Sequence, residues 1–219
     1  YFVRGDGQGS NANNGLTWST AFATLQKALD TVPTTSSARN LFTATQPRVV
    51  NVQASVAPQA YNVAARSVGA PLNVEFRGGW ENVDTTPVQS GMSMVQDLDG
   101  PIDKAGLSIT GANHSGYRRI MVSSFAFTNV TRGVEIITAS GSDWADIYLI
   151  ASNCLVRSQV DGLYVNYTKS FSYANGTGYG GLGQIKAYDV DIVAGLGDNG
   201  CAIFSDAHWG GSVISAVGY

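Results

Sequence analysis

Hydrophobic and polar residues alternate along three related segments of the chain, which begin at Arg119, Asp146 and Gln184. Each segment begins with a short run of alternating hydrophobic and polar residues, which ends at a polar turn. A second such run follows, and then a loop leads to a glycine and a third run. A period of two is that of a β-strand, in which every second side chain faces the same side. The pattern therefore predicts three short strands in each repeat.

Aligning the three repeats predicts columns of inward-facing side chains. The alignment gives one shared position to Gly133, Gly162 and Gly200. The expected columns join Ile120 with Ile147 and Ile185, Val122 with Leu149 and Ala187, Phe127 with Cys154 and Ile192, Val134 with Leu163 and Cys201, and Ile136 with Val165 and Ile203. In a solenoid each coil buries its apolar edge only against neighbouring coils, and such columns meet that need. The sequence thus predicts stacked coils, with residues 167–183 as a protruding loop.

An amphipathic segment near the N-terminus predicts a single helix, from about Ser19 to Thr31. Its apolar residues recur at spacings of three and four: Phe22, Leu25, Leu29 and Val32. Thr17, Ser19 or Thr20 could cap its start, and Pro33 ends it. A helix in this place would cover the open end of the first coil.

The chain is expected to form one domain over residues 1–219. Its parts are an N-terminal strand, loop and capping helix (1–33), first irregular coils (48–110), regular coils (117–206) and the start of a further coil (212–219). Within these parts, strands are expected at 1–3, 48–52, 61–63 and 107–110, and a loop at 92–103. Because the last coil is incomplete, we expect a continuing chain or self-association at this C-terminal edge.

Several segments resemble one group of known proteins. The segments NGLTW at 14–18 and AFATLQKAL at 21–29 are similar to the N-terminal module of secreted bacterial right-handed parallel β-helix proteins, the pectin-lyase-like and polymorphic-outer-membrane-protein-like surface proteins. VEFRGGW at 74–80 resembles an early coil of that group, and DLDG at 97–100 lies where the family carries an Asp-rich turn. The resemblance implies an all-β fold, a right-handed parallel β-helix (solenoid) with an N-terminal capping α-helix. The family includes adhesins and polysaccharide-cleaving enzymes, so the fold leaves activity open.

Composition and charge narrow the class of protein. Charged residues make up only 13% of the 219 residues, and the net charge is −3 with no basic cluster, which excludes nucleic acid as a partner. Apolar runs are too short to span a membrane. A neutral polar surface is common outside cells, so we expect a secreted or cell-surface protein. Both cysteines, Cys154 and Cys201, are expected to be buried free thiols.

Aromatic residues form the candidate ligand surface. Tyr148, Tyr164 and Tyr188 alternate with inward residues and should face solvent, while Trp144 and Tyr167 are expected in loops. Exposed rings beside Asn and Asp suit the CH faces and hydroxyls of sugars, so we expect a polysaccharide or cell-surface glycan as partner. The alternative is a protein interface or the packing of loops.

Two acidic groups are candidates for Ca²⁺, and no other cofactor is expected. Asp97, Asp99 and Asp103 cluster in a turn, and Asp189 and Asp191 are two apart on a strand, where they could also form an acid pair. The alternatives are turn capping for the first group and a solvated strand face for the second. The sequence RGD at 4–6 matches a tripeptide that some integrins read, although chance matches are frequent in Gly-rich loops.

The resemblance also sets out what an enzyme of this class would carry. Its polygalacturonate hydrolases have a Gly-His-Gly, an Arg-Ile-Lys and paired Asp motifs, and none of these occurs here. We therefore expect an extracellular or cell-surface structural and adhesion protein that contacts carbohydrate or self-assembles. The alternatives are a polysaccharide lyase or glycoside hydrolase, and a tail spike of the phage type in which three β-helices associate.

Overall fold

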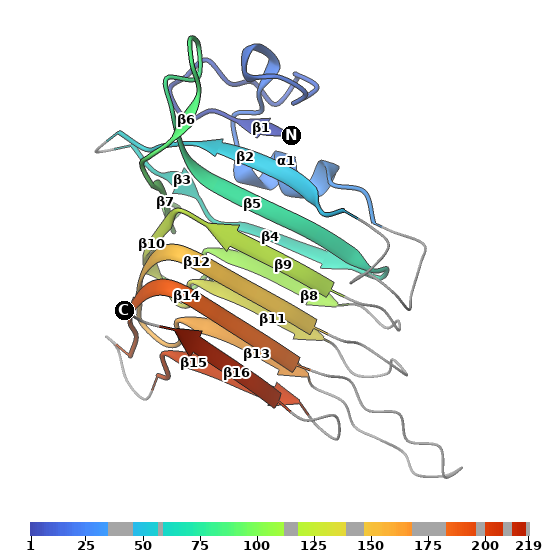
Figure 1. The fold of residues 1–219 in the computed structure, drawn as a ribbon, viewed down its shortest axis with the longest axis vertical. Helices are drawn as coiled ribbons and strands as arrows, with labels where there is room; N and C mark the ends of the chain where they lie inside the picture. The colour runs from blue at the N-terminus through green and yellow to red at the C-terminus, as the bar shows by residue number, and fades with distance from the viewer. Residues whose placement is uncertain are drawn as a thin grey trace.

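The computed structural model describes residues 1–34, 46–56, 59–111, 118–138, 147–167, 183–195, 200–207 and 212–217. The described residues form sixteen strands, one α-helix and one 3-10 turn, so this part of the chain is all-β, as predicted. Figure 1 shows the strands piled in two main layers from the N-terminal end to the C-terminal end.

The broad sheet at the front of Figure 1 is parallel and has a side branch. Its strands follow the order β1 (Phe2–Val3), β2 (Arg48–Gln53), β5 (Leu72–Glu81), β9 (Arg118–Ser123), β12 (Ile147–Ser158), β14 (Gly183–Val193) and β16 (Ser212–Val217). The first half of β12 pairs with β9, and its second half pairs with β10 (Phe125–Val130). Beyond β10 the branch continues with β7 (Ser93–Gln96) and β3 (Tyr61–Asn62), while β6 (Val88–Gln89) pairs antiparallel with β5.

The second sheet lies behind the first and is also parallel. Its order is β4 (Ala64–Val68), β8 (Leu107–Gly111), β11 (Val134–Thr138), β13 (Leu163–Tyr167) and β15 (Ile203–Ala207). From β8 onward the chain passes from one sheet to the other, and each new strand lies beside the preceding strand of the same sheet. The inward side chains of both sheets and of the side branch form one hydrophobic cluster.

The strand register confirms two members of each predicted column and differs by two residues for the third: Val134 pairs with Leu163 and Ile136 with Val165, as predicted. Leu149, and not Ile147, lies between Ile120 and Ile185. In the front sheet and its branch, Ala151 likewise lies between Val122 and Ala187, and Val156 lies between Phe127 and Ile192. In the back sheet, Ile203 follows Val134 and Leu163, and Ser205 follows Ile136 and Val165. Gly106 shares the position of Gly133 and Gly162. One residue in each predicted column is therefore assigned to the wrong column: Ile147, Leu149, Cys154, Cys201, Ile203 and Gly200. A slip of two leaves an inward residue inward, and both Ile147 and Leu149 are fully buried.

The two cysteines differ in their surroundings. Cys154 is buried at 3% exposure, as predicted, and its thiol is free. Cys201 is free but exposed, so that prediction is wrong. It lies just before β15 rather than in an inward column, and its backbone N–H donates to Asp161 Oδ1 at 3.0 Å.

The polar turn of each repeat is a bend in the backbone. Ser124, Asn153 and Asp189 have φ angles of 59°, 47° and 51°, in the left-handed region that short polar side chains tolerate better than aliphatic ones. Asn153 Nδ2 also donates to Ser124 Oγ at 3.0 Å, which ties one bend to the next. These bends turn the front strands into the side branch.

The N-terminal helix is shorter than predicted. α1 spans Leu25–Thr31, and Thr24 caps it by accepting the N–H of Lys27 at 3.1 Å. The residues before it are a 3-10 turn, η1 (Trp18–Thr20), followed by extended chain, because Phe22 bridges to Val3.

The helix covers the edge strand of the back sheet. α1 packs against β4 through a buried face of Leu25, Ala28 and Leu29. Gln26 also exchanges two side-chain hydrogen bonds with the backbone of Ala65, at 2.8 and 2.9 Å. These bonds occupy peptide groups that an edge strand would otherwise leave open.

Of the two predicted loops, one is wrong in part and the other lies mostly outside the described residues. The segment predicted as a loop over 92–103 contains β7, so this prediction is wrong in part. The four residues of β7 are too few and too polar for their alternation to identify a strand. The loop predicted over 167–183 lies outside the described residues, except for its ends in β13 and β14. The strands predicted near 1–3, 48–52, 61–63 and 107–110 are confirmed as β1, β2, β3 and β8.

Candidate functional site

The outer face of the back sheet carries a cleft of about 230 Å³. Its apolar wall is formed by Val63, Ala65 and Ala105. Its polar groups come from Asp103, Lys104, Ser108, Thr131, Arg132 and Glu135. The cleft spans three strands because Ala65, Ser108 and Glu135 share one outward register position on β4, β8 and β11.

Glu135 is the central acceptor of the cleft. Ser108 Oγ is 2.6 Å from its Oε1, and Arg132 Nη1 donates to its Oε2 at 3.0 Å. Hydrogen bonds that involve ionised groups are stronger than neutral ones, so these two contacts fix the orientation of the Glu135 side chain. The arrangement suits fixed hydrogen bonding.

Arg132 joins the cleft to the next strand of the sheet. Its Nε donates to Asp161 Oδ2 at 2.8 Å, and Asp161 Oδ1 accepts the N–H of Cys201. Partial burial of the guanidinium would lower the pKa of Arg132, but the hydrogen bonds that it donates to Asp161 and Glu135 raise this pKa above its ordinary value. Arg132 therefore stays charged and holds two carboxylates in place.

The acidic turn at residues 97–103 borders the cleft. Asp97 is buried and accepts the backbone N–H groups of Asp103 and Lys104 at 3.3 and 3.2 Å. Burial would raise the pKa of Asp97, but the backbone hydrogen bonds from Asp103 and Asp99 and the nearby Lys104 ammonium lower this pKa. Lys104 Nζ lies 3.4 Å from Asp97 and 3.6 Å from Asp99. The lysine ammonium is thus the cation that these two carboxylates contact, and Ca²⁺ binding at this turn stays a prediction.

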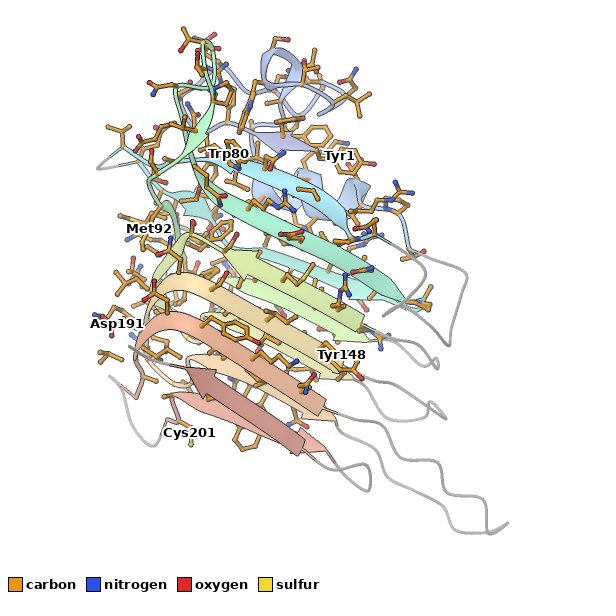
Figure 2. All side chains as sticks on the ribbon, viewed as in Figure 1. Tyr1, Trp80, Met92, Tyr148, Asp191 and Cys201 are labelled. Atoms are coloured by element: carbon orange, nitrogen blue, oxygen red, sulfur yellow. The ribbon has the colours of Figure 1, made fainter. Side chains whose placement is uncertain are left out.

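The second calcium candidate rested on strand alternation across Asp189 and Asp191. Asp189 lies in the bend with positive φ, so alternation does not extend across the pair. Asp191 is exposed at the side of the sheet in Figure 2, and its Oδ2 accepts from Arg157 Nη2 at 2.7 Å. Among the described residues, no three His, Cys, Asp or Glu side chains gather as a metal site would require.

Tyr164 lies next to the cleft but does not offer a free ring face. The Arg132 guanidinium lies over its ring at 4.0 Å from the centroid, and Phe204 stacks on it at 4.8 Å with an angle of 12°. These partners come from opposite sides, since β11 and β15 flank β13. Carbohydrate contact by Tyr164 stays a prediction, and with both ring faces in contact it would involve the ring edge and the hydroxyl.

The other predicted aromatic residues are scattered. Tyr148 lies on the front sheet (Figure 2) and is only 9% exposed, so the prediction that it faces solvent is wrong. Tyr188 is 41% exposed on β14, as predicted. Trp144 lies outside the described residues, and only the backbone of Tyr167 is described. Among the described side chains, Tyr164 lies on the back sheet, whereas Tyr148 and Tyr188 lie on the front sheet.

Apart from Asp103, the sequence reasoning missed the residues that line the cleft. Ser108 precedes the first of the three repeats, and Glu135 and its neighbour Asp161 belong to the first and second repeats, so only the register brings them together. One signal was available: Glu135 is a charged outward residue between inward Val134 and Ile136, in a chain with few charges.

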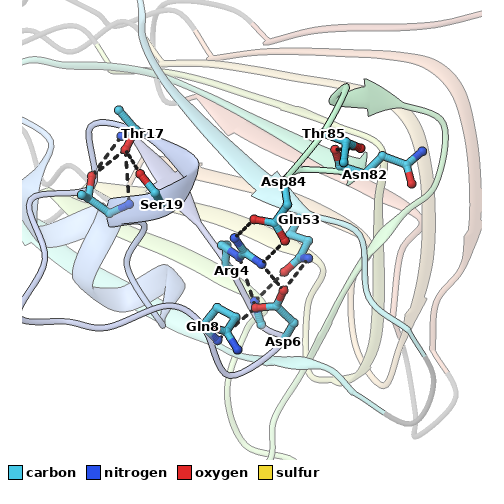
Figure 3. Close-up of polar contacts among 11 residues, drawn as sticks. Arg4, Asp6, Gln8, Thr17, Ser19, Gln53, Asn82, Asp84 and Thr85 are labelled. Atoms are coloured by element: carbon cyan, nitrogen blue, oxygen red, sulfur yellow. Dashed lines mark hydrogen bonds and ion pairs between the residues drawn. The ribbon is translucent and has the colours of Figure 1, made fainter.

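The RGD sequence at 4–6 serves the fold. Arg4 is only 4% exposed and lies between the carboxylates of Asp6 and Asp84 (Figure 3). Gln53 Nε2 also donates to Asp6 at 3.0 Å. Because its guanidinium is enclosed, this tripeptide is not presented to a receptor.

Comparison with known proteins adds no assignment. No family model, no curated protein and no solved structure matches the chain. In the part of the chain that the structure describes, no helix has the length and apolar character needed to cross a membrane.

Proposed function

We propose that the chain is a right-handed parallel β-helix that serves as an extracellular or cell-surface structural and adhesion protein and contacts carbohydrate. One observation carries this proposal: both sheets gain parallel strands in step, up to β15 and β16. A chain that returns to each sheet one strand further along builds coils around one axis. Crossovers between parallel strands are nearly always right-handed, which supports that hand.

Stacked coils suit a structural role. Each coil rests on its neighbours, so the backbone hydrogen bonds run along the axis and stiffen it. Seven strands of the front sheet, from β1 to β16, would rise about 29 Å at the usual spacing between strands. Such a body displays loops and cleft-lining side chains at fixed places.

The paired charges of the cleft suit a binding role. Glu135, Arg132 and Asp161 hold one another, and Lys104 is held by Asp97 and Asp99. Side chains held in this way keep fixed positions and present oriented hydrogen-bonding groups to a ligand. A secreted or surface location agrees with the low charge content of 13%.

A glycan array probed with the whole chain tests the proposal. We expect binding to at least one glycan and no shortening of that glycan on incubation. Chain shortening that persists through repeated purification would instead establish a polysaccharide lyase or hydrolase. Absence of binding to every glycan on the array would remove carbohydrate contact from the proposal.

A further inference from the structure

We propose that the cleft between β4, β8 and β11 binds one neutral sugar residue of a glycan. This inference rests on the proposed function and names the ligand of one site within it. The residues that argue for it are Ser108, Thr131, Arg132 and Glu135, which line the cleft.

The charges of the cleft favour a neutral ligand. The two acidic and two basic side chains that line it cancel in formal charge. Both cations already have carboxylate partners: Glu135 and Asp161 for Arg132, and Asp97 and Asp99 for Lys104. An anionic ligand would compete with those carboxylates, and a cationic one would compete with the cations. A neutral polyol disturbs neither set of ion pairs.

Unused hydrogen-bonding groups remain on the ion pair itself. Arg132 has five N–H donors, and two of them are used, one on Nε and one on Nη1. The other three make no hydrogen bond to the described part of the chain. Glu135 can accept about four hydrogen bonds and accepts two. The two side chains are 26% and 13% exposed, so both reach solvent.

These groups match two adjacent hydroxyls of a sugar. A hydroxyl donates one hydrogen bond and also accepts, so one hydroxyl can accept from Arg132 while its neighbour donates to Glu135. Hydrogen bonds to ionised groups are about twice as strong as neutral ones. The Thr131 hydroxyl has no hydrogen bond within the described chain and adds a third polar group. Val63, Ala65 and Ala105 offer a small apolar wall to the C–H groups of the ring.

The size of the cleft sets the length of the ligand. Its volume of about 230 Å³ is below the range of about 300–1,000 Å³ for pockets that enclose drug-sized molecules. One sugar ring fits this volume better than an oligosaccharide does. No aromatic ring is among the residues that line the cleft, and both faces of neighbouring Tyr164 are covered. We therefore expect a weak site, with a Kd on the order of 1–10 mM.

Titration of the whole chain with small glycosides, followed by two-dimensional NMR, tests the inference. The probes are the methyl glycosides of glucose, galactose, mannose and N-acetylglucosamine, compared with glucuronic acid and glucosamine. The variants are Glu135→Gln and Thr131→Val, which keep the side-chain shapes. The matched control is Glu75→Gln, because Glu75 forms an equivalent pair with Arg77 on the front sheet, at 2.8 Å.

We expect a neutral glycoside to bind, with affinity reduced about tenfold by Glu135→Gln and about threefold by Thr131→Val, and unchanged by Glu75→Gln. Urea unfolding of each variant establishes that it is folded; a variant that does not fold is replaced by Ser108→Ala. Equal affinity in the cleft variants and the parent would overturn the inference. So would tighter binding of glucuronic acid or glucosamine than of any neutral probe. If the array shows glycan binding but no neutral glycoside binds, this site is rejected while the proposed function stands.

Discussion

Replacing Asp6 by Asn should destabilise the N-terminal end of the protein in a pH-dependent way. Asp6 accepts from Arg4 Nε at 3.2 Å and Nη2 at 2.5 Å, from Gln8 N at 3.1 Å, and from Gln53 Nε2 at 3.0 Å. In Asp6→Asn one acceptor oxygen becomes an NH₂ group. On either side of the carboxyl that group would meet a donor of Arg4.

The size of the loss follows from the pKa of Asp6. Partial burial would raise this pKa, but the hydrogen bonds from Arg4, Gln53 and Gln8 lower it from 3.8 to about 2. A lowering of that size corresponds to about 2.4 kcal/mol. The carboxyl is 32% exposed, so solvent screening reduces the figure, and we expect a loss of about 1–2 kcal/mol at neutral pH.

The sign of the pH dependence is fixed by the direction of that pKa. The folded-state pKa is below the unfolded-state value, so the stabilisation is present above pH 3.8 and is lost as pH falls toward about 2. The difference in unfolding free energy between the parent and Asp6→Asn should therefore shrink to roughly half near pH 3.

Urea unfolding at pH 7 and pH 3 measures this difference. Tryptophan fluorescence is the probe, since the rings of Trp18 and Trp80 lie 6.3 Å apart near this end. Asp30→Asn is the control, because Asp30 is exposed on α1 and, within the described part of the chain, accepts only from Gln26; it should change stability by less than about 0.5 kcal/mol. A loss for Asp6→Asn that is as large at pH 3 as at pH 7, or no loss at pH 7, would refute the reasoning.

Two further predictions concern the core and the thiols. Phe127→Ala should lower the unfolding free energy by about 3–5 kcal/mol, because Phe127 is fully buried against Phe125; Met94→Ala, at an outward position of the same branch, should cost far less. Equal losses in urea unfolding would contradict the inward position of Phe127. Ellman's reagent should modify Cys201 in the folded protein and Cys154 only after unfolding, because burial raises the pKa of Cys154 to about 11. Mass spectrometry identifies the site, and rapid labelling of Cys154 without denaturant would disprove its burial.

The alternation of the sequence was enough to predict which positions face the core. Ile120, Ile136 and Val165 were placed inward from period two alone, and all are buried. The polar turns and most of the early strands were found in the same way, because local composition controls turns and strand ends. The helix was placed too early because propensity and spacing do not report that Phe22 pairs with Val3.

The aromatic residues show where this reasoning stops. Alternation assigned Tyr148, Tyr164 and Tyr188 to the outer faces of strands, and it did so without information on what covers those faces. Phe204 and Arg132 cover Tyr164 from neighbouring strands, while Tyr188 remains open. The exposure of a side chain depends on residues that are distant in the sequence, and the sequence of a single repeat does not identify those residues.

By itself, the sequence determined the all-β class and the inward or outward side of most strand positions, because side-chain direction follows from strand geometry within a few residues. Only the tertiary structure decided the register where the aligned repeats gave a wrong partner, since a slip of two residues keeps every side chain on its face and leaves the hydrophobic pattern unchanged. The cleft depends on the register: Ser108 meets Glu135 only when Leu107 pairs with Val134, and Arg132 meets Asp161 only when Val134 pairs with Leu163. A site assembled across strands therefore follows from pairing energies summed over the whole stack, which no local pattern contains.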